Sequence, residues 1–197
     1  MAEAVTWTPR PGTEMDLDLA ARARSGDTTA FESLLEPRMS GLARFALAVI
    51  GDEHDARDAV QTACVQAWRE LPALRDVARF DAWLGRILAN SCRQLLRSRK
   101  RRRVREIAVS ELEPRADSPD MSRMAPGPAD VVADLDALGR AFDRLDSDAR
   151  ILLVHHHLEG LSIGDIAART GLSAATVKWR LHMARAALER SLEAEYR

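Results

Sequence analysis

The stretch from Leu161 to Arg185, LSIGDIAARTGLSAATVKWRLHMAR, constrains the fold of this chain most, because it encodes two short helices and the tight turn between them. Ser162, with Asp165 three residues later, has the pattern of a capping box that opens a helix. Gly171 suits the left-handed conformation that ends this helix, and Ser173 suits the cap of the next one. The stretch therefore predicts a helix-turn-helix.

The apolar residues of this stretch are spaced so that the two helices share a small core. They are Ile166, Ala167, Leu172, Val177 and Leu181. The same spacing leaves other faces to Lys178, Trp179, Arg180, His182 and Arg185. Helix-turn-helix units of this kind typically bind duplex DNA, although helix–glycine–helix corners also occur in enzymes and structural bundles.

Composition predicts an all-α protein, because aromatic residues make up only 5% of the 197 residues while Ala, Leu and Arg are abundant. The formal net charge of −1 hides a segregation of charge along the chain. Every charged residue from Ala82 to Arg105 is basic, whereas Asp dominates from Asp130 to Asp148. A near-neutral total charge is therefore compatible with a phosphate-binding tract.

A Pro-rich segment divides the chain into two small helical domains. Pro114, Pro119, Pro126, Gly127 and Pro128 stand there among Ser, Asp and Met residues, a composition that sustains neither a helix nor a core. We predict a disordered tail over residues 1–14, a first helical domain over 15–108, a flexible linker over 109–129 and a helix-turn-helix domain over 130–197.

Two helices of the first domain present a polar face opposite an apolar stripe. Over residues 55–71, apolar residues recur every three or four positions and leave Asp58, Gln61 and Gln66 outside. In the next helix Arg86, Asn90, Arg93 and Arg97 form a strip beside the apolar side, near Phe80 and Trp83. Such a strip suits a phosphate backbone with exposed bases, although many Arg-rich helices are simply solvated. The spacing of Trp83 favours a core position over an exposed one.

The blocks DARDAVQTACVQAWREL, RFDAWLGRILANSCRQLLRSRKRR and LSIGDIAARTGLSAATVKWRLHMARAAL, with a Pro-rich spacer before the last, resemble regions two and four of the extracytoplasmic-function (ECF) sigma factors of bacterial RNA polymerase. The resemblance spans nearly the whole chain after the tail. It implies a promoter-specificity subunit that binds the RNA polymerase core, recognises the minus-35 and minus-10 elements of promoter DNA and helps to melt the duplex. An anti-sigma factor is a further expected partner.

The resemblance also assigns candidate residues. The polymerase-binding positions are Asp58, Gln61 and Gln66. The minus-10 positions are Arg75, Phe80, Arg86, Asn90, Arg93 and Arg97, and the connection over 75–80 corresponds to a loop that receives an unstacked base. The minus-35 positions are Ala174, Ala175, Lys178, Trp179, His182 and Arg185. Trp179 replaces the small polar residue usual in the family, and Met183 replaces a common basic one, so the resemblance does not fix which bases are recognised; a large indole can read groove shape or a thymine methyl instead of a hydrogen-bonding edge.

Other features favour neither catalysis nor a cofactor. His155, His156 and His157 are consecutive, whereas metal ligands on a helix usually recur at i and i+4. No nucleophile elbow, phosphate loop or zinc-protease motif occurs, so we expect no enzyme activity, no metal, no cofactor and no small-molecule substrate. Cys64 and Cys92 are too few for a disulfide framework. With no signal peptide or membrane-insertion segment in the sequence, we expect a cytoplasmic protein.

Two alternative functions compete with that of a sigma factor. A stand-alone helix-turn-helix regulator would bind an operator and use its N-terminal domain for dimerisation or sensing. An RNA-binding or antitermination protein would use the Arg run but leave the helix-turn-helix unexplained. The polar face of the 55–71 helix separates the first alternative from a sigma factor, because only a sigma factor needs that face for polymerase.

Overall fold

The computed structural model describes residues 13–110 and 129–196, and every regular element in these ranges is a helix or a helical turn, which confirms the all-α prediction there. The N-terminal domain contains α1 (Glu14–Arg24), α2 (Thr28–Leu35), α3 (Met39–Ile50), α4 (Glu53–Glu70) and α5 (Phe80–Ser110). The C-terminal domain contains α6 (Ala129–Asp143), α7 (Ser147–Leu153), α8 (Ile163–Thr170) and α9 (Ala174–Glu195). Residues 111–128 of the predicted linker lie outside the described residues.

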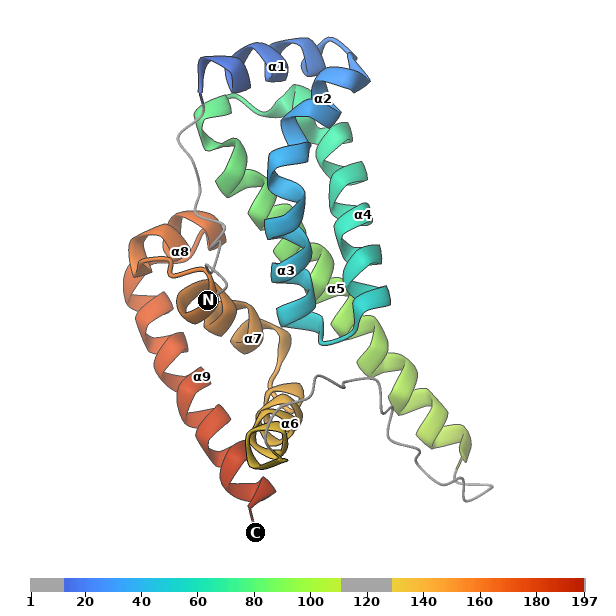
Figure 1. Ribbon diagram of the computed structural model, residues 1–197, viewed down its shortest axis with the longest axis vertical. Coiled ribbons are helices and arrows are strands. Elements are labelled where there is room, and N and C mark those ends of the chain that lie inside the picture. Colours follow the sequence, from blue (N-terminus) through green and yellow to red (C-terminus); the bar gives the residue numbers. More distant parts are fainter. Residues whose placement is uncertain (1–12, 111–128, 197) are drawn as a thin grey trace.

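In the N-terminal domain α3, α4 and α5 run side by side, and α1 lies across one end of them (Figure 1). Their buried face is built from small and branched apolar residues, with Ala46, Ala63, Ala67, Leu42 and Leu84 fully enclosed. Ala at these positions lets the helices approach closely, while Leu fills the space between them. The apolar stripe predicted for the 55–71 helix is therefore confirmed as core.

The helix boundaries follow capping side chains. Thr13 and Asp16 form a capping box at the start of α1, so Glu14, which we assigned to the tail, lies in a helix. Asp52 caps α4, which begins at Glu53, two residues before the start predicted at position 55. α5 and α4 are joined by more than packing, since Arg99 forms ion pairs with Asp52 and Asp55.

A buried arginine joins three parts of the N-terminal domain. The guanidinium of Arg38 hydrogen-bonds Asp81 at the start of α5, lies 3.2 Å from Oδ1 of Asp16 in α1 and donates to the carbonyl oxygen of Leu34 at 2.6 Å. It also lies over the ring of Phe80, 5.2 Å from the centroid. Burial disfavours the charge of Arg38, but the hydrogen bonds that its guanidinium donates to Asp81 and Asp16 outweigh this effect and raise the pKa of Arg38.

The predicted helix-turn-helix is confirmed in the C-terminal domain. Ser162 and Asp165 form the capping box of α8, Gly171 ends the helix at φ 73°, and Ser173 caps α9. The shared core consists of the five predicted residues together with Leu152, Leu161 and Ile163. The far end of α9 is held to α6, because Glu195 pairs with Arg140 and Arg144, and the hydroxyl of Tyr196 donates to Asp134.

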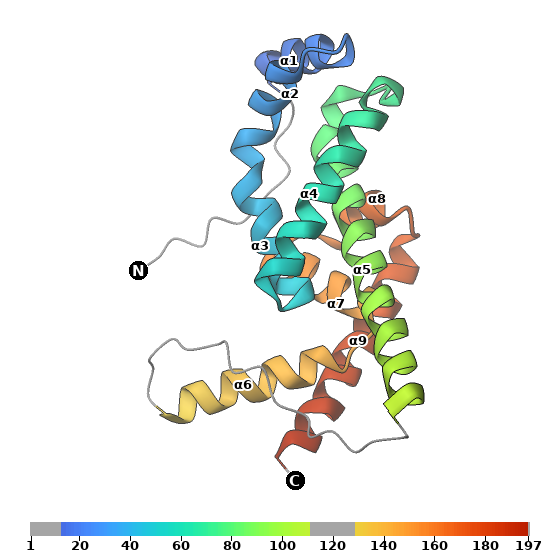
Figure 2. The same ribbon diagram turned by 90° about the vertical axis from the view of Figure 1, so that its right-hand side faces the viewer.

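The two domains pack against each other, which the sequence did not predict. Ile151 and Val154 of the C-terminal domain belong to the core of the N-terminal domain, and α7 and α8 contact α5. Figures 1 and 2 place the C-terminal domain against one side of α3 and α5, with α4 on the other side. No helix of the described residues is long and apolar enough to cross a membrane.

Candidate nucleic-acid and polymerase interfaces

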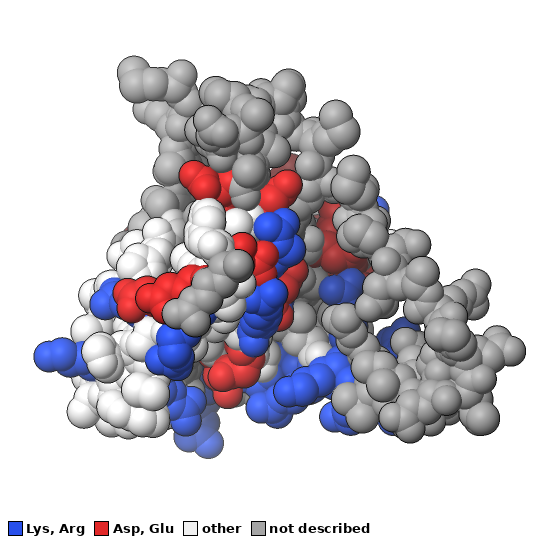
Figure 3. All heavy atoms as spheres, turned by 90° about the horizontal axis from the view of Figure 1, so that it is seen from below, with Lys and Arg blue, Asp and Glu red and all other residues white. Residues whose placement is uncertain are grey.

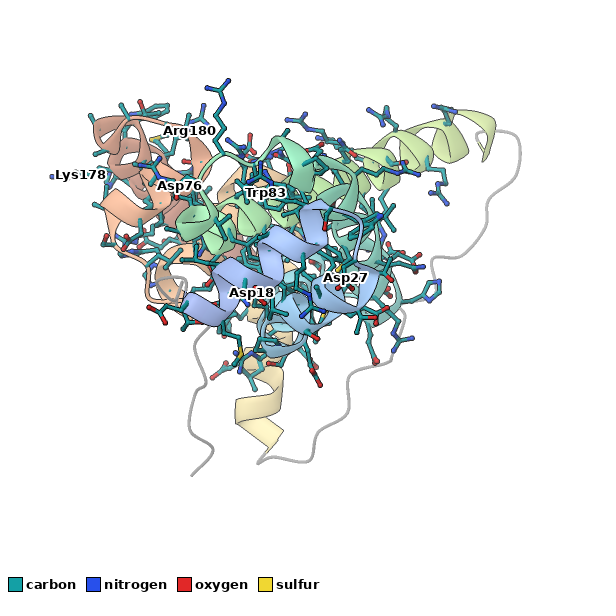
Figure 4. The ribbon with its side chains drawn as sticks, turned by 90° about the horizontal axis from the view of Figure 1, so that it is seen from above. Asp18, Asp27, Asp76, Trp83, Lys178 and Arg180 are labelled. Atoms are coloured by element: carbon teal, nitrogen blue, oxygen red, sulfur yellow. The ribbon has the colours of Figure 1, made fainter. Side chains whose placement is uncertain are left out.

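The N-terminal half of α9 presents an open surface. Ala174, Ala175, Lys178, His182 and Arg185 are exposed, and Figure 4 shows Lys178 and Arg180 pointing away from the protein in different directions. The side chain of Trp179 is 62% exposed, and Met183, one turn later, is 44% exposed. An indole in this position has no packing role in its own domain, so the surface combines cationic groups with a large apolar contact.

Arg185, one of these cationic residues, is hydrogen-bonded to a histidine of the turn that follows α7. The Nε of Arg185 donates to Nε2 of His157 at 3.2 Å. His157 belongs to a π turn over Val154–Leu158 that follows α7. Burial, together with the neighbouring Arg185 and His156, lowers the pKa of His157 and favours the neutral ring that can accept this bond.

The predicted basic strip on α5 is only partly free. Arg86, Asn90 and Arg97 are exposed, as is Arg75 in the preceding connection. The Nε of Arg93, in the middle of the strip, instead lies 2.5 Å from Oδ1 of Asp148 at the start of α7. Seen from below, Lys and Arg side chains predominate at the lower margin of the view, whereas acidic and basic side chains alternate across its middle (Figure 3).

Phe80 does not face solvent in this conformation, and its contact with DNA stays a prediction. Its side chain is 2% exposed and lies between Arg38 and Trp83, whose ring centroid is 5.6 Å away. Phe80 is the first residue of α5, so it points into the core and supports the connection instead of lining its surface. Trp83 is half-buried against the same core, in line with the predicted core position.

The helix α4 lies on the side of α3 and α5 that is away from the C-terminal domain (Figures 1 and 2). Asp58 and Gln61 are exposed, and the half-buried Gln66 donates to Glu70 at 2.9 Å. The structure adds Val65, whose side chain is 45% exposed on the same face. Its place four residues after Gln61 and seven after Asp58 could have revealed it, because those spacings put all three on one side of a helix.

The three consecutive histidines have separate surroundings. His155 is 1% exposed, stacks on Phe45 of α3 at 4.7 Å between centroids, and its Nδ1 lies 2.6 Å from Oε2 of Glu159. The same carboxylate oxygen accepts from the buried Arg169 at 3.2 Å. Burial is the main cause that lowers the pKa of His155, against the opposing effect of Glu159. This cluster is part of the domain packing.

The cysteines are also part of the core. Cys92 is fully buried, and desolvation raises the pKa of its thiol to about 12. Such a thiol is a poor nucleophile at neutral pH, so a redox role for it has no chemical support. Cys64 is half-buried against the same core, and burial raises the pKa of its thiol as well.

Comparison with known proteins identifies both domains. The model of sigma-70 region 2 matches residues 34–102, and the model of sigma-70 region 4 matches residues 135–188. The chain is 33% identical over 177 residues to the ECF RNA polymerase sigma factor SigM of Mycobacterium tuberculosis, covering 90% of this chain and 84% of SigM. It is 33% identical over 187 residues to the RNA polymerase sigma factor CnrH of Cupriavidus metallidurans, covering 92% of this chain and 96% of CnrH.

Solved structures agree with this relationship. CnrH in complex with the cytosolic domain of CnrY superposes with a TM-score of 0.59 at 32% identity, over 92% of this chain and 99% of that chain. The sigma factor RpoE in complex with the anti-sigma factor NepR from Bartonella quintana gives a TM-score of 0.56 at 27% identity, over 83% of this chain and 96% of that chain. A region 2 match to the N-terminal domain leaves the operator-binding alternative without support. The chain therefore belongs to the ECF family: it is an alternative sigma factor, which binds the RNA polymerase core and directs transcription initiation at promoters.

Proposed function

We propose that three surfaces divide the work of this sigma factor. The exposed face of α4, with Asp58, Gln61, Gln66 and Val65, docks on the polymerase core. The strip of Arg75, Arg86, Asn90, Arg93 and Arg97 contacts the minus-10 element. Ala174, Ala175, Lys178, Trp179, His182 and Arg185 contact the minus-35 element. The observation that carries the proposal is that two cationic surfaces stand on different domains while a third, mixed surface faces elsewhere.

The α4 face has the character of a protein interface. An exposed Val65 surrounded by acid and amide side chains gives an apolar centre with a polar rim, which is the usual anatomy of a contact between proteins. Asp58, Gln61 and Val65 are exposed in the structure in which the two domains are packed together, so this face is accessible in that arrangement. Core polymerase can therefore engage this face first.

The two DNA surfaces differ in chemistry. The α5 strip offers guanidinium groups and one amide, which suit phosphates and unstacked bases. The α9 surface offers Lys178 near the N-terminal end of a recognition helix, the part that enters the major groove most deeply. Exposed Trp179 suits a thymine methyl or groove shape better than a hydrogen-bonding base edge.

We also propose that the protein has no chemistry of its own and acts in the cytoplasm, where core polymerase and promoter DNA are found. An anti-sigma factor is a further proposed partner, by analogy with the NepR complex of the Bartonella quintana sigma factor. Binding of the polymerase core, of the minus-10 element and of the minus-35 element are all recognition functions. Each needs exposed side chains on rigid helices, and α4, α5 and α9 provide them.

A triple substitution tests the polymerase face. Replacing Asp58, Gln61 and Gln66 by Ala should weaken association with purified core polymerase by about tenfold or more, as hot-spot losses do, without unfolding α4. A matched control replaces three exposed polar residues of the same domain, Glu32, Ser33 and Glu36, by Ala. Equal core affinity for both triple variants, at unchanged helicity, would show that polymerase does not use this face.

A further inference from the structure

The three consecutive histidines follow α7 in a π turn, and two of them lie beside the helix-turn-helix. The π turn covers Val154–Leu158 and is followed by Gly160, whose φ is 66°. Turns of this kind are rare and often stand at functional sites. His155 is buried in the domain packing, whereas His156 is half-buried and His157 is exposed. Neither His156 nor His157 belongs to the three surfaces of the proposed function.

His156 fixes the place of this turn on the helix-turn-helix. Its Nδ1 donates to the carbonyl oxygen of Leu161 at 3.1 Å, and Leu161 is part of the core that α8 and α9 share. The rings of His156 and His157 meet edge to face, with their centroids 4.9 Å apart. The position of the His157 ring is therefore set from the core of the helix-turn-helix through His156, although His157 itself is exposed.

The His157 ring holds the guanidinium of Arg185 by one nitrogen. The Nε of Arg185 donates to Nε2 of His157 at 3.2 Å. Within the described residues the guanidinium makes no other hydrogen bond or ion pair, so both of its terminal amino groups stay free. A guanidinium binds a phosphate best through two parallel N–H groups, and the terminal amino groups provide such a pair. The contact with His157 therefore orients Arg185 without using the donors that a DNA phosphate needs.

The partner of Arg185 differs from a carboxylate in carrying no charge. Arg140, in the same domain, pairs with the carboxylate of Glu195, which neutralises its charge. The pKa of His157 instead lies below its ordinary value, because burial and the neighbouring Arg185 and His156 disfavour the imidazolium. A neutral ring accepts at Nε2 and leaves the positive charge of Arg185 available to a phosphate.

We propose that His157 is a positioning residue for minus-35 binding: its neutral ring fixes the guanidinium of Arg185, whose free amino groups then bind a phosphate of the DNA backbone. Fixing the side chain in advance lowers the entropy that is lost when DNA immobilises it. Protonation of His157 ends the arrangement, because an imidazolium has no acceptor nitrogen and repels Arg185. The inference rests on the proposed minus-35 role of Arg185.

An NMR titration of the full chain tests the contact itself. The ring signal of His157 is assigned by its loss in His157→Gln, and its pKa is measured between about pH 5 and pH 8. Arg185→Ala removes a neighbouring positive charge and should raise this pKa towards the ordinary value of about 6.5. Arg190→Ala, the same change at another exposed position of α9, is the control and should leave the pKa unchanged. An unchanged His157 pKa in Arg185→Ala would overturn the proposal.

Equilibrium binding of the holoenzyme to a promoter selected from a random library tests the effect on DNA. His157→Ala should weaken binding roughly two- to tenfold, the cost of immobilising one flexible side chain. His157→Gln keeps an acceptor at a similar reach and should bind like the wild type. Leu158→Ala, at the next exposed position of the turn, is the control and should also bind like the wild type. Undiminished binding by His157→Ala, or no rescue by His157→Gln, would refute the positioning role.

A double variant separates positioning from a direct contact with DNA. If His157 acts through Arg185, His157→Ala should weaken binding no further in a chain that already carries Arg185→Ala. A second loss of the same size would show that His157 binds DNA by itself, and the positioning role would be wrong. If Arg185→Ala shifts the His157 pKa but leaves promoter binding unchanged, the proposed minus-35 role of Arg185 fails instead.

Discussion

Arg38 should be among the most costly positions to change in the N-terminal domain. Arg38→Met keeps the length and apolar stem of the side chain but removes one partner from each of two carboxylates, Asp81 and Asp16. Asp81 is 4% exposed, and removing one member of a buried ion pair typically costs about 3–5 kcal/mol, with the lower end expected where the remaining charge keeps other contacts. Asp16 lies nearer the surface, so water compensates it in part. We therefore expect a loss of about 3 kcal/mol, a large part of the 5–15 kcal/mol typical of a domain.

Urea unfolding followed by far-UV circular dichroism measures this loss. Arg57→Met is the matched control, because Arg57 pairs with Glu53 on the open surface of α4 and such pairs contribute about 0.3–0.5 kcal/mol. The double variant Arg38→Met with Asp81→Leu removes both buried charges and should recover much of the stability. If Arg38→Met and Arg57→Met lost the same small amount, the reasoning from buried charge would be refuted.

Three further predictions concern the C-terminal domain. Lys178→Ala should cost about 1–3 kcal/mol and relax preference at one or two minus-35 base pairs, whereas Arg185→Ala should weaken all sequences alike and flatten the salt dependence, as measured with holoenzyme on a promoter library. Trp179→Ser should change which minus-35 sequences that library selects without altering affinity for core; an unchanged preference would leave Trp179 without a reading role. The pKa of His155 is lower in the folded protein than in the unfolded chain, so its contribution to stability is complete above about pH 6.5 and declines as the pH falls below that value. The melting temperature of His155→Gln should therefore fall less between pH 7.5 and pH 5.5 than that of the wild type, and equal slopes would contradict this.

Local features of the fold were predictable from the sequence, because each is determined by a few neighbouring residues. The capping box of Ser162 and Asp165, the left-handed Gly171 and the cap at Ser173 all act within one helical turn. The apolar seam between α8 and α9 follows from helical spacing in the same way. The surface positions of Lys178 and Asp58 followed from that spacing too.

The remaining features depend on contacts between distant parts of the chain. Phe80 seemed available to DNA because nothing in a single sequence shows that Arg38, 42 positions earlier, lies over its ring. Arg150 and Arg169 are buried, although arginine is mostly a surface residue. The contact between Arg93 and Asp148 joins residues 55 positions apart across the predicted linker, so local periodicity could not reveal it.

The continuous helix α9 connects the two ends of the C-terminal domain. It contains 22 residues and is therefore about 33 Å long, with the residues proposed to contact the minus-35 element at one end and Glu195 at the other. Ala184, near the middle of α9, is 3% exposed and packs with Leu145 and Leu153, so the helix is fixed to its domain at this point. Glu195 and Tyr196 hold the far end of this helix to α6 and its neighbourhood through Arg140, Arg144 and Asp134. These contacts, about 25 Å from Lys178, therefore help to set the direction of the surface proposed for the minus-35 element.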